Sequence, residues 1–182
     1  MIRILFLVLS LLGAPLPATA DQVDPRLDIL FKSLKQAPSL ADAVAVENTI
    51  WTIWLESDRE GVSRLLEDGM IAMSRGAYGP AIEAFSGAIR QAPDFAEAWN
   101  KRATAYYLLG EFESSVRDIQ KTLALEPRHF GALSGLGLIY LAIDNDAGAK
   151  KAYEKALEIH PLMPGVKAQL QRLKDRIGGK AI

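Results

Sequence analysis

Apolar residues recur along most of this chain at the spacing of amphipathic helices. The positions i, i+4 and i+7 are apolar in one segment at Trp99, Ala103 and Tyr106 and in another at Ala81, Phe85 and Ala88. This spacing places side chains on one face of a helix. No stretch alternates apolar and polar residues as a half-buried strand would. The pattern therefore predicts an all-helical (all-α) chain.

The helical pattern repeats with a period of 34 residues, because Pro93, Pro127 and Pro161 are 34 residues apart. Stepping by this period aligns residues of like size: Leu65, Trp99 and Leu133; Gly69, Ala103 and Gly137; Ala81, Ser115 and Ala149; Phe85, Ile119 and Tyr153; Ala88, Thr122 and Ala156. Turns are predicted between the two helices of each unit, at Gly76, at Gly110 and, in the third unit, at Asp144-Asn145-Asp146. Each unit is therefore predicted to be a helix pair whose small residues let the backbones approach closely.

These residues resemble the tetratricopeptide repeat (TPR). The second unit carries Trp99, Arg102, Ala103, Tyr106, Ser115, Ile119, Thr122 and Pro127, and the third carries Leu133, Leu136, Gly137, Tyr140, Ala149, Tyr153, Ala156 and Pro161. The resemblance implies a right-handed solenoid of about three helix pairs. The pairs would occupy 62–95, 96–129 and 130–161, within the segment 61–161.

A further helical pair is predicted in residues 21–60. Asp24-Pro25 is a good helix start, and Ser39 is a candidate cap for the second helix. In the 34-residue register, Glu47 and Trp54 stand where small residues are expected. The pair is therefore predicted to be a degenerate repeat with altered packing.

The segment 162–182 is predicted to form a C-terminal capping helix and tail, because an end repeat would otherwise expose its stacking face. Its apolar stripe is Val166, Leu170, Leu173 and Ile177. It is also cationic, with Lys167, Arg172, Lys174, Arg176 and Lys180 against Asp175. We favour a solvated helix whose cations complement the helix dipole; the alternative is a site for an anionic partner such as phospholipid or polysaccharide.

Residues 1–20 are predicted to be an export signal. Arg3 precedes an apolar run from Ile4 to Leu12, and helix breakers then lead to Ala18-Thr19-Ala20. Cleavage would leave Asp21 as the mature N-terminus of a periplasmic or secreted protein. A retained membrane anchor is the alternative, but the apolar run is shorter than the roughly twenty residues that span a bilayer.

The composition removes several kinds of chemistry. The 182 residues include no cysteine, which excludes disulfides, thiolate metal sites and cysteine nucleophiles. A formal charge of −1 gives no general attraction to nucleic acid. The histidines, His129 and His160, occupy equivalent inter-repeat turns, which favours turn or capping roles over catalysis or metal binding. We therefore expect no catalytic residue, no cofactor, no metal and no membrane span in the mature chain.

Two function classes remain. The resemblance implies a non-catalytic scaffold that binds a protein or peptide partner on its concave surface. The alternative is a small helical carrier or enzyme that handles an apolar ligand in the same groove. The absence of an acid–base or nucleophile constellation disfavours an enzyme.

By resemblance, the first helix of each unit lines the concave surface. The partner-binding positions would be Leu66, Met70, Met73, Asn100, Thr104, Tyr107, Ser134, Leu138 and Leu141. The basic residues of the chaperone-tail carboxylate clamp are not matched, since Leu66, Met70, Gly131 and Gly135 stand at those positions. Two competing interpretations are that these residues are plain core, or that the N-terminal helices fill the groove.

Overall fold

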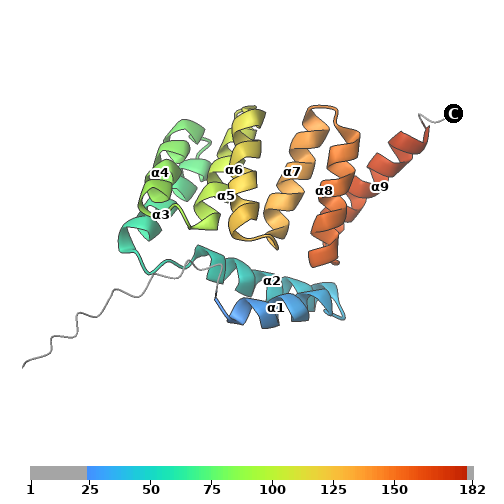
Figure 1. Cartoon of the computed structure of the whole chain (residues 1–182), viewed down its shortest axis with the longest axis horizontal. Helices are drawn as coiled ribbons and strands as arrows, with labels where there is room; N and C mark the ends of the chain where they lie inside the picture. Colours follow the sequence, from blue (N-terminus) through green and yellow to red (C-terminus); the bar gives the residue numbers. More distant parts are fainter. Residues whose placement is uncertain (1–23, 180–182) are drawn as a thin grey trace, which may run out of the picture.

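The computed structural model describes residues 24–179, and every regular element in that part of the chain is a helix (Figure 1). The three predicted pairs are α3 (Glu60–Ser74) with α4 (Tyr78–Gln91), α5 (Ala96–Leu108) with α6 (Phe112–Leu125), and α7 (Phe130–Ala142) with α8 (Asp146–Ile159). They are preceded by α1 (Arg26–Lys35) and α2 (Leu40–Leu55) and followed by α9 (Pro164–Gly179). The predicted export signal and Lys180 lie outside the described residues.

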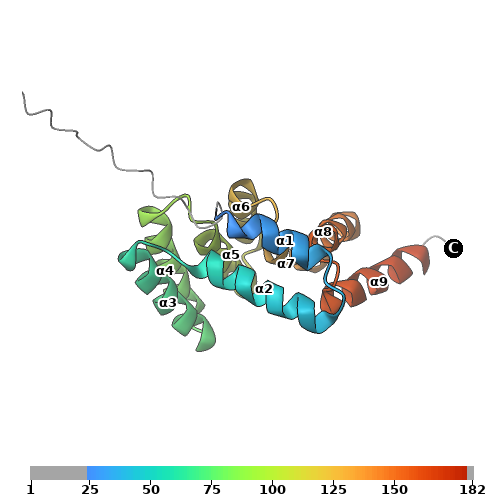
Figure 2. The same ribbon diagram turned by 90° about the horizontal axis from the view of Figure 1, so that it is seen from below.

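The repeat helices form a two-layered solenoid, with α3, α5 and α7 on one side and α4, α6 and α8 on the other (Figure 2). From α3 to α9, each helix packs chiefly against its neighbours in the chain. The final helix, α9, continues the layer of first helices and covers the end of the stack, as predicted. Its Val166, Leu170 and Leu173 are buried in a cluster with Ala149 and Tyr153 of α8.

The 34-residue register appears directly in the packing. A Cβ atom added at Gly69 would overlap the ring of Phe85, and one added at Gly137 would overlap the ring of Tyr153. In the middle unit, Ala103 and Ile119 meet in one buried cluster. The matched sizes are therefore needed because a large side chain of each second helix occupies the space that a small residue of the first helix leaves free.

The turns inside the helix pairs differ in chemistry but share a backbone conformation. Gly76 has φ 70°, Gly110 has φ 77° and Asp144 has φ 56°, all in the left-handed region. Aspartate is one of the few non-glycine residues that tolerate this region. The next residue, Asn145, caps α8 by accepting the backbone N–H of Gly148 at 2.9 Å. The expectation of a turn at 144–146 is confirmed.

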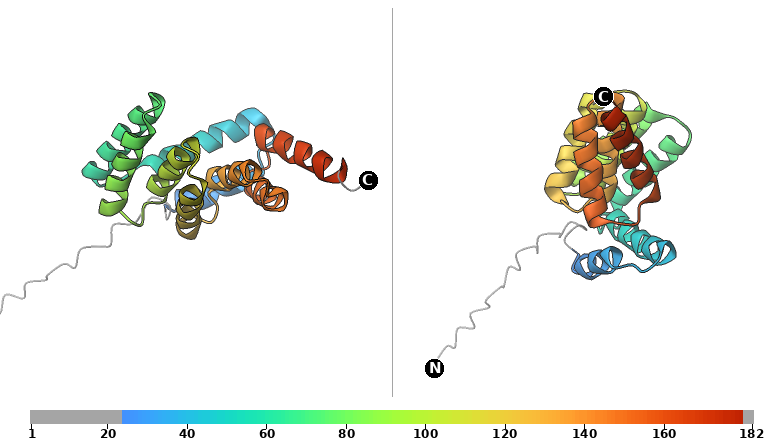
Figure 3. Two further views of the ribbon diagram at one scale, coloured as in Figure 1. Left: turned by 90° about the horizontal axis from the view of Figure 1, so that it is seen from above. Right: turned by 90° about the vertical axis from the view of Figure 1, so that its right-hand side faces the viewer.

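The N-terminal pair does not extend the stack. Figures 1 and 3 show α1 and α2 running across the ends of the repeat helices. The pair contacts α5 and α8, and its core includes Trp54 and Phe130, the first residue of α7. The prediction of a degenerate repeat is therefore wrong: Glu47 and Trp54 are too large for the small-residue positions, and both side chains turn instead toward the inter-repeat turns.

Candidate functional site: the concave groove

A groove of about 280 Å³ opens between α5 and α7, with α6 as its floor. It is lined by Asn100, Ala103, Thr104, Tyr107, Leu108, Ser115, Ile119, Gly131, Ala132, Ser134, Gly135, Leu138 and Ile139. Most of these side chains are apolar or small, and none carries a formal charge. The groove is therefore suited to apolar side chains rather than to ions.

Several polar groups of the groove are already engaged within the protein. The hydroxyl of Thr104 donates to the carbonyl of Asn100 at 3.0 Å, and that of Ser134 donates to the carbonyl of Gly131 at 2.9 Å. The amide of Asn100 donates to Glu97 at 3.0 Å. Because these donors are satisfied, the surface offers a ligand mainly apolar contact and hydrogen-bond acceptors.

The structure brings five of the nine predicted partner-binding residues into this groove: Asn100, Thr104, Tyr107, Ser134 and Leu138. The prediction is wrong for Leu66, which is only 2% exposed and packs with Phe85 in the core around α3 and α4. Its equivalents Asn100 and Ser134 line the groove, although Asn100 is itself only 8% exposed.

The other predicted residues lie elsewhere. Met70 and Met73 are half-buried against the same core cluster as Leu66 and do not line the groove between α5 and α7, so their role in partner binding stays a prediction. Leu141 lines a separate cleft between α7 and α9. The period aligned these residues correctly, but it contains no information on how far each side chain is drawn into the core.

One end of the groove is closed by the N-terminal pair. The ring of Trp51 lies so close to Gly131 that a Cβ there would be 2.6 Å from the indole Cη2. The ammonium of Lys101 lies 5.5 Å from the centre of the Trp51 ring, and the indole N–H donates to Glu47 at 3.1 Å. The N-terminal helices thus border the groove and leave it open, so they do not fill it.

A buried carboxylate–imidazole pair joins this end of the groove to the turn before α7. The Nδ1 of His129 accepts the backbone N–H of Ala132 at 3.0 Å, so the ring proton resides on Nε2 and is donated to Glu97 at 2.9 Å. Trp54 stacks on the imidazole with ring centres 4.1 Å apart. The capping role predicted for His129 is confirmed.

The ionisation of Glu97 depends on these neighbours. Burial by itself would raise the pKa of Glu97, but the hydrogen bond from His129 and the charge of Lys101 hold that pKa below its ordinary value. In the sequence, Asp94 and Glu97 have the spacing of a capping box at the start of a helix, which does not predict a buried pair with a histidine. Glu97 is paired because the fold brings His129, which lies 32 residues later in the sequence, next to it. No local sequence motif predicts this contact.

His160, in the equivalent turn after α8, binds the N-terminal pair instead. Its Nε2 lies 3.1 Å from the Glu47 carboxylate, and its ring meets Phe130 edge-on with centres 5.2 Å apart. Both histidines therefore serve packing between segments distant in the chain. Within residues 24–179, no group of three or more His, Asp or Glu side chains is placed to hold a metal ion.

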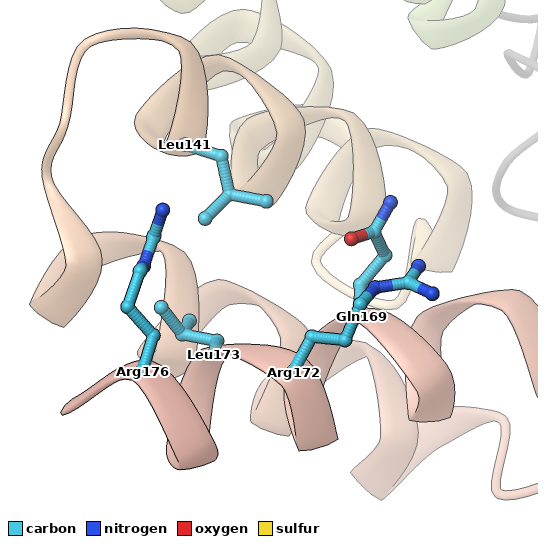
Figure 4. Close-up of a pocket in the computed structure, with 5 residues that line it drawn as sticks. All are labelled: Leu141, Gln169, Arg172, Leu173 and Arg176. Atoms are coloured by element: carbon cyan, nitrogen blue, oxygen red, sulfur yellow. The ribbon is translucent and has the colours of Figure 1, made fainter. Parts of the chain in front are cut away.

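The second cleft, of about 200 Å³, lies between α7 and α9 (Figure 4). Leu141 forms one wall, and Gln169, Arg172, Leu173 and Arg176 of α9 form the other. Arg176 also pairs with Asp146 at the start of α8. This cleft is cationic, in contrast to the neutral groove beside it.

A stack of helix pairs with a 34-residue register and an open concave groove defines a helical repeat solenoid. Tetratricopeptide repeat models match residues 96–129 and 131–161. A TPR repeat-containing protein of Rhizobium etli is 32% identical over 179 residues, which cover 91% of this chain and 88% of that protein. The chain belongs to the tetratricopeptide repeat family.

Solved structures agree with this assignment. The Sgt2 TPR domain from Aspergillus fumigatus has a TM-score of 0.64 at 29% identity, covering 68% of this chain and 83% of that one. The first TPR of Spaghetti (RPAP3), bound to the HSP90 peptide SRMEEVD, has a TM-score of 0.64 at 26% identity, covering 66% of this chain and 96% of that one. No helix among residues 24–179 is long and apolar enough to cross a membrane.

Proposed function

We propose that this protein is a non-catalytic interaction scaffold that binds a segment of a partner protein in the groove between α5 and α7. The observation that carries the proposal is the open, uncharged groove that gathers Tyr107, Leu138 and three further residues expected to bind a partner. Membership of the tetratricopeptide repeat family supports it, as does the peptide bound by the similar domain of Spaghetti.

The groove favours a segment with apolar anchors. Tyr107 offers a large contact area together with a phenol, and Leu138, 37% exposed, provides an apolar ridge. The SRMEEVD peptide is acidic, and the lining of this groove contains no lysine or arginine. We therefore expect the groove itself not to hold such a tail. A carrier of a small apolar ligand is less well supported, because the groove opens to solvent instead of enclosing a cavity.

The test is partner capture by matched variants. Tyr107→Ala and Leu138→Glu should each reduce the set of proteins retained on the immobilised protein, as measured by quantitative mass spectrometry. Ile143→Glu is the control, because Ile143, directly after α7, is an exposed apolar residue that does not line the groove. Circular dichroism should show unchanged helix content in all three. Equal retention by the two groove variants and the control would overturn the proposal.

We further propose that the chain is exported and cleaved after Ala20, which the charged start, apolar run and small-residue site of the sequence support. Protein recovered from the periplasm or the medium should begin at Asp21 by N-terminal sequencing. Intact Met1 in the membrane fraction would indicate a retained anchor instead.

A further inference from the structure

The neutral groove and the cationic cleft are adjacent on the concave surface. Leu138 lines the groove and Leu141 lines the cleft, and both belong to α7 at the i, i+3 spacing. Residues at this spacing are neighbours on one helix face, with Cβ atoms about 5–6 Å apart. A partner segment that crosses α7 over these two leucines therefore passes directly from the groove into the cleft.

The cleft presents a focused cationic site. Gln169, Arg172 and Arg176 follow one another along one face of α9, and Figure 4 shows their side chains directed toward the side of α9 on which Leu141 lies. Arg176 is partly neutralised by Asp146. Arg172 forms no ion pair with any residue between 24 and 179. Both arginines are exposed, so their guanidinium groups are accessible to a carboxylate that could accept charge-assisted hydrogen bonds.

A buried phenol, that of Tyr153, lies near this cleft. The phenol oxygen of Tyr153 is buried and has no hydrogen-bond partner among the described residues. Burial raises the pKa of Tyr153 to about 12; the nearby Tyr107 adds to this shift, and Arg172 opposes it. The phenol of Tyr153 therefore interacts electrostatically with Tyr107 of α5 and with Arg172 of α9.

We propose that the cleft between α7 and α9 binds an acidic side chain, through Arg172 with Gln169 and Arg176, on the same partner segment whose apolar anchor occupies the α5/α7 groove. This inference rests on the proposed function. Neighbouring helix axes are about 8–10 Å apart, and an extended chain advances about 3.3 Å per residue. The acidic residue therefore lies about three residues from the apolar anchor.

The distribution of charge favours a carboxylate on a protein segment over an anionic lipid or polysaccharide surface. Lys167 and Lys174 lie two and five residues from Gln169 along α9, and at 100° per residue they fall on the opposite side of this helix from Arg172. The cations of α9 therefore form no single broad patch. A pocket with one unpartnered guanidinium beside an apolar groove fits one acid next to an apolar anchor.

The experiment selects ligands without assuming their sequence. A phage library of random 12-residue peptides is panned on the purified protein, and enriched peptides are synthesised with a fluorescent label. Their dissociation constants are then measured by fluorescence anisotropy, each peptide being paired with a copy in which Asp or Glu is replaced by Asn or Gln. The protein variants are Arg172→Gln, Leu138→Glu and the matched control Lys174→Gln, whose folding is checked by circular dichroism.

We expect enriched peptides to contain an apolar residue and an acid about three residues apart. Replacing the acid by its amide, or Arg172 by Gln, should each weaken binding about fivefold, the upper range for a partly exposed ion pair. Making both changes should weaken it little further, because both remove the same interaction. Lys174→Gln should leave the affinity unchanged.

The opposite results separate the two proposals. Peptides that lose affinity with Leu138→Glu but are indifferent to their acid would overturn the acidic subsite and leave the groove function standing. The absence of any enriched peptide sensitive to Leu138→Glu would overturn both. Arg172-dependent binding to phosphatidylglycerol vesicles, without a preference for acidic peptides, would assign the cleft to an anionic surface and overturn the peptide source.

Discussion

The repeat stack and the N-terminal pair are both built from antiparallel helices, yet their cores follow different rules. In the stack, glycine or alanine of one helix faces an aromatic or branched side chain of the next, as Gly69 faces Phe85 and Gly137 faces Tyr153. In the N-terminal pair, large side chains converge on the inter-repeat turns, where Trp54 stacks on His129 and contacts Phe130. The first core is periodic, and the second is not.

This difference shows how one solenoid can acquire a fixed flank without adding a repeat. A repeat added to the end of the stack must match the sizes already there, so its positions are constrained by the period. A helix pair across the turns only needs complementary partners in those turns. His129 and His160 provide them, because Trp54 stacks on the ring of His129 and the Nε2 of His160 lies 3.1 Å from the Glu47 carboxylate. The flank also closes one end of the candidate binding groove through Trp51.

The largest expected effect comes from removing the central aromatic residue of the N-terminal pair. Trp54→Ala should lower the free energy of unfolding of that pair by about 3–5 kcal/mol, the cost of deleting a large core side chain. Hydrogen exchange should show α1 and α2 losing protection while α3 to α8 keep theirs. Equal loss of protection throughout would mean that the two regions form one cooperative unit, and the contrast drawn above would fail.

The complementary change overpacks the repeat stack. Ala149 is fully buried between helices, so Ala149→Leu should lower the free energy of unfolding by roughly 1–3 kcal/mol. Ala147→Leu is the matched control on the exposed side of α8 and should cost much less. Thermal melts followed by circular dichroism provide the comparison. A melting temperature equal to that of the parent would contradict the small-residue register.

Acid should act on the junction between the two regions. Because the pKa of Glu97 is below its ordinary value of 4.5 in the folded state, its stabilising contribution is present above pH 4.5 and is lost as the pH falls through the folded pKa. In that window the free energy of unfolding should fall by up to about 1.4 kcal/mol per pH unit from this one group. The free energy of unfolding, measured by urea titration at several pH values between 3 and 6, should fall less with decreasing pH in Glu97→Gln than in the parent. An identical pH dependence in the two proteins would exclude Glu97 as the source.

The smallest effect is expected at the surface ion pair that links the two regions. Arg128 bonds Asp28 at 2.6 Å, but the Asp28 side chain is 81% exposed. Exposed pairs contribute about 0–1 kcal/mol, so Asp28→Asn should change the free energy of unfolding by less than that. A double-mutant cycle with Arg128→Gln measures the coupling. A value of several kcal/mol would show that charge, and not the Trp54 cluster, anchors the N-terminal pair.

The candidate site could be predicted from the sequence only in part. Asn100, Thr104, Tyr107, Ser134 and Leu138 were predicted from the resemblance to the tetratricopeptide repeat, whose first helices line the concave surface, and the structure places all five at the groove. Leu66 occupies the same register as Asn100, and both are buried, but only Asn100 lines the groove. The repeat period predicts on which face of its helix a residue lies, but not how far its side chain is buried. The degree of burial depends on which side chains fill the space between the helices.

The sequence by itself determined the class, the number of repeat pairs, the turns within them and the capping helix, because each depends on spacing and residue size within about 34 residues. The tertiary structure alone decided the place of α1 and α2, the pairing of Glu97 with His129, and the meeting of α7 with α9 around Arg172. These contacts join residues that no local pattern relates. Their geometry follows from which surfaces remain uncovered once the repeats have stacked, which is a property of the assembled helices and not of any one segment.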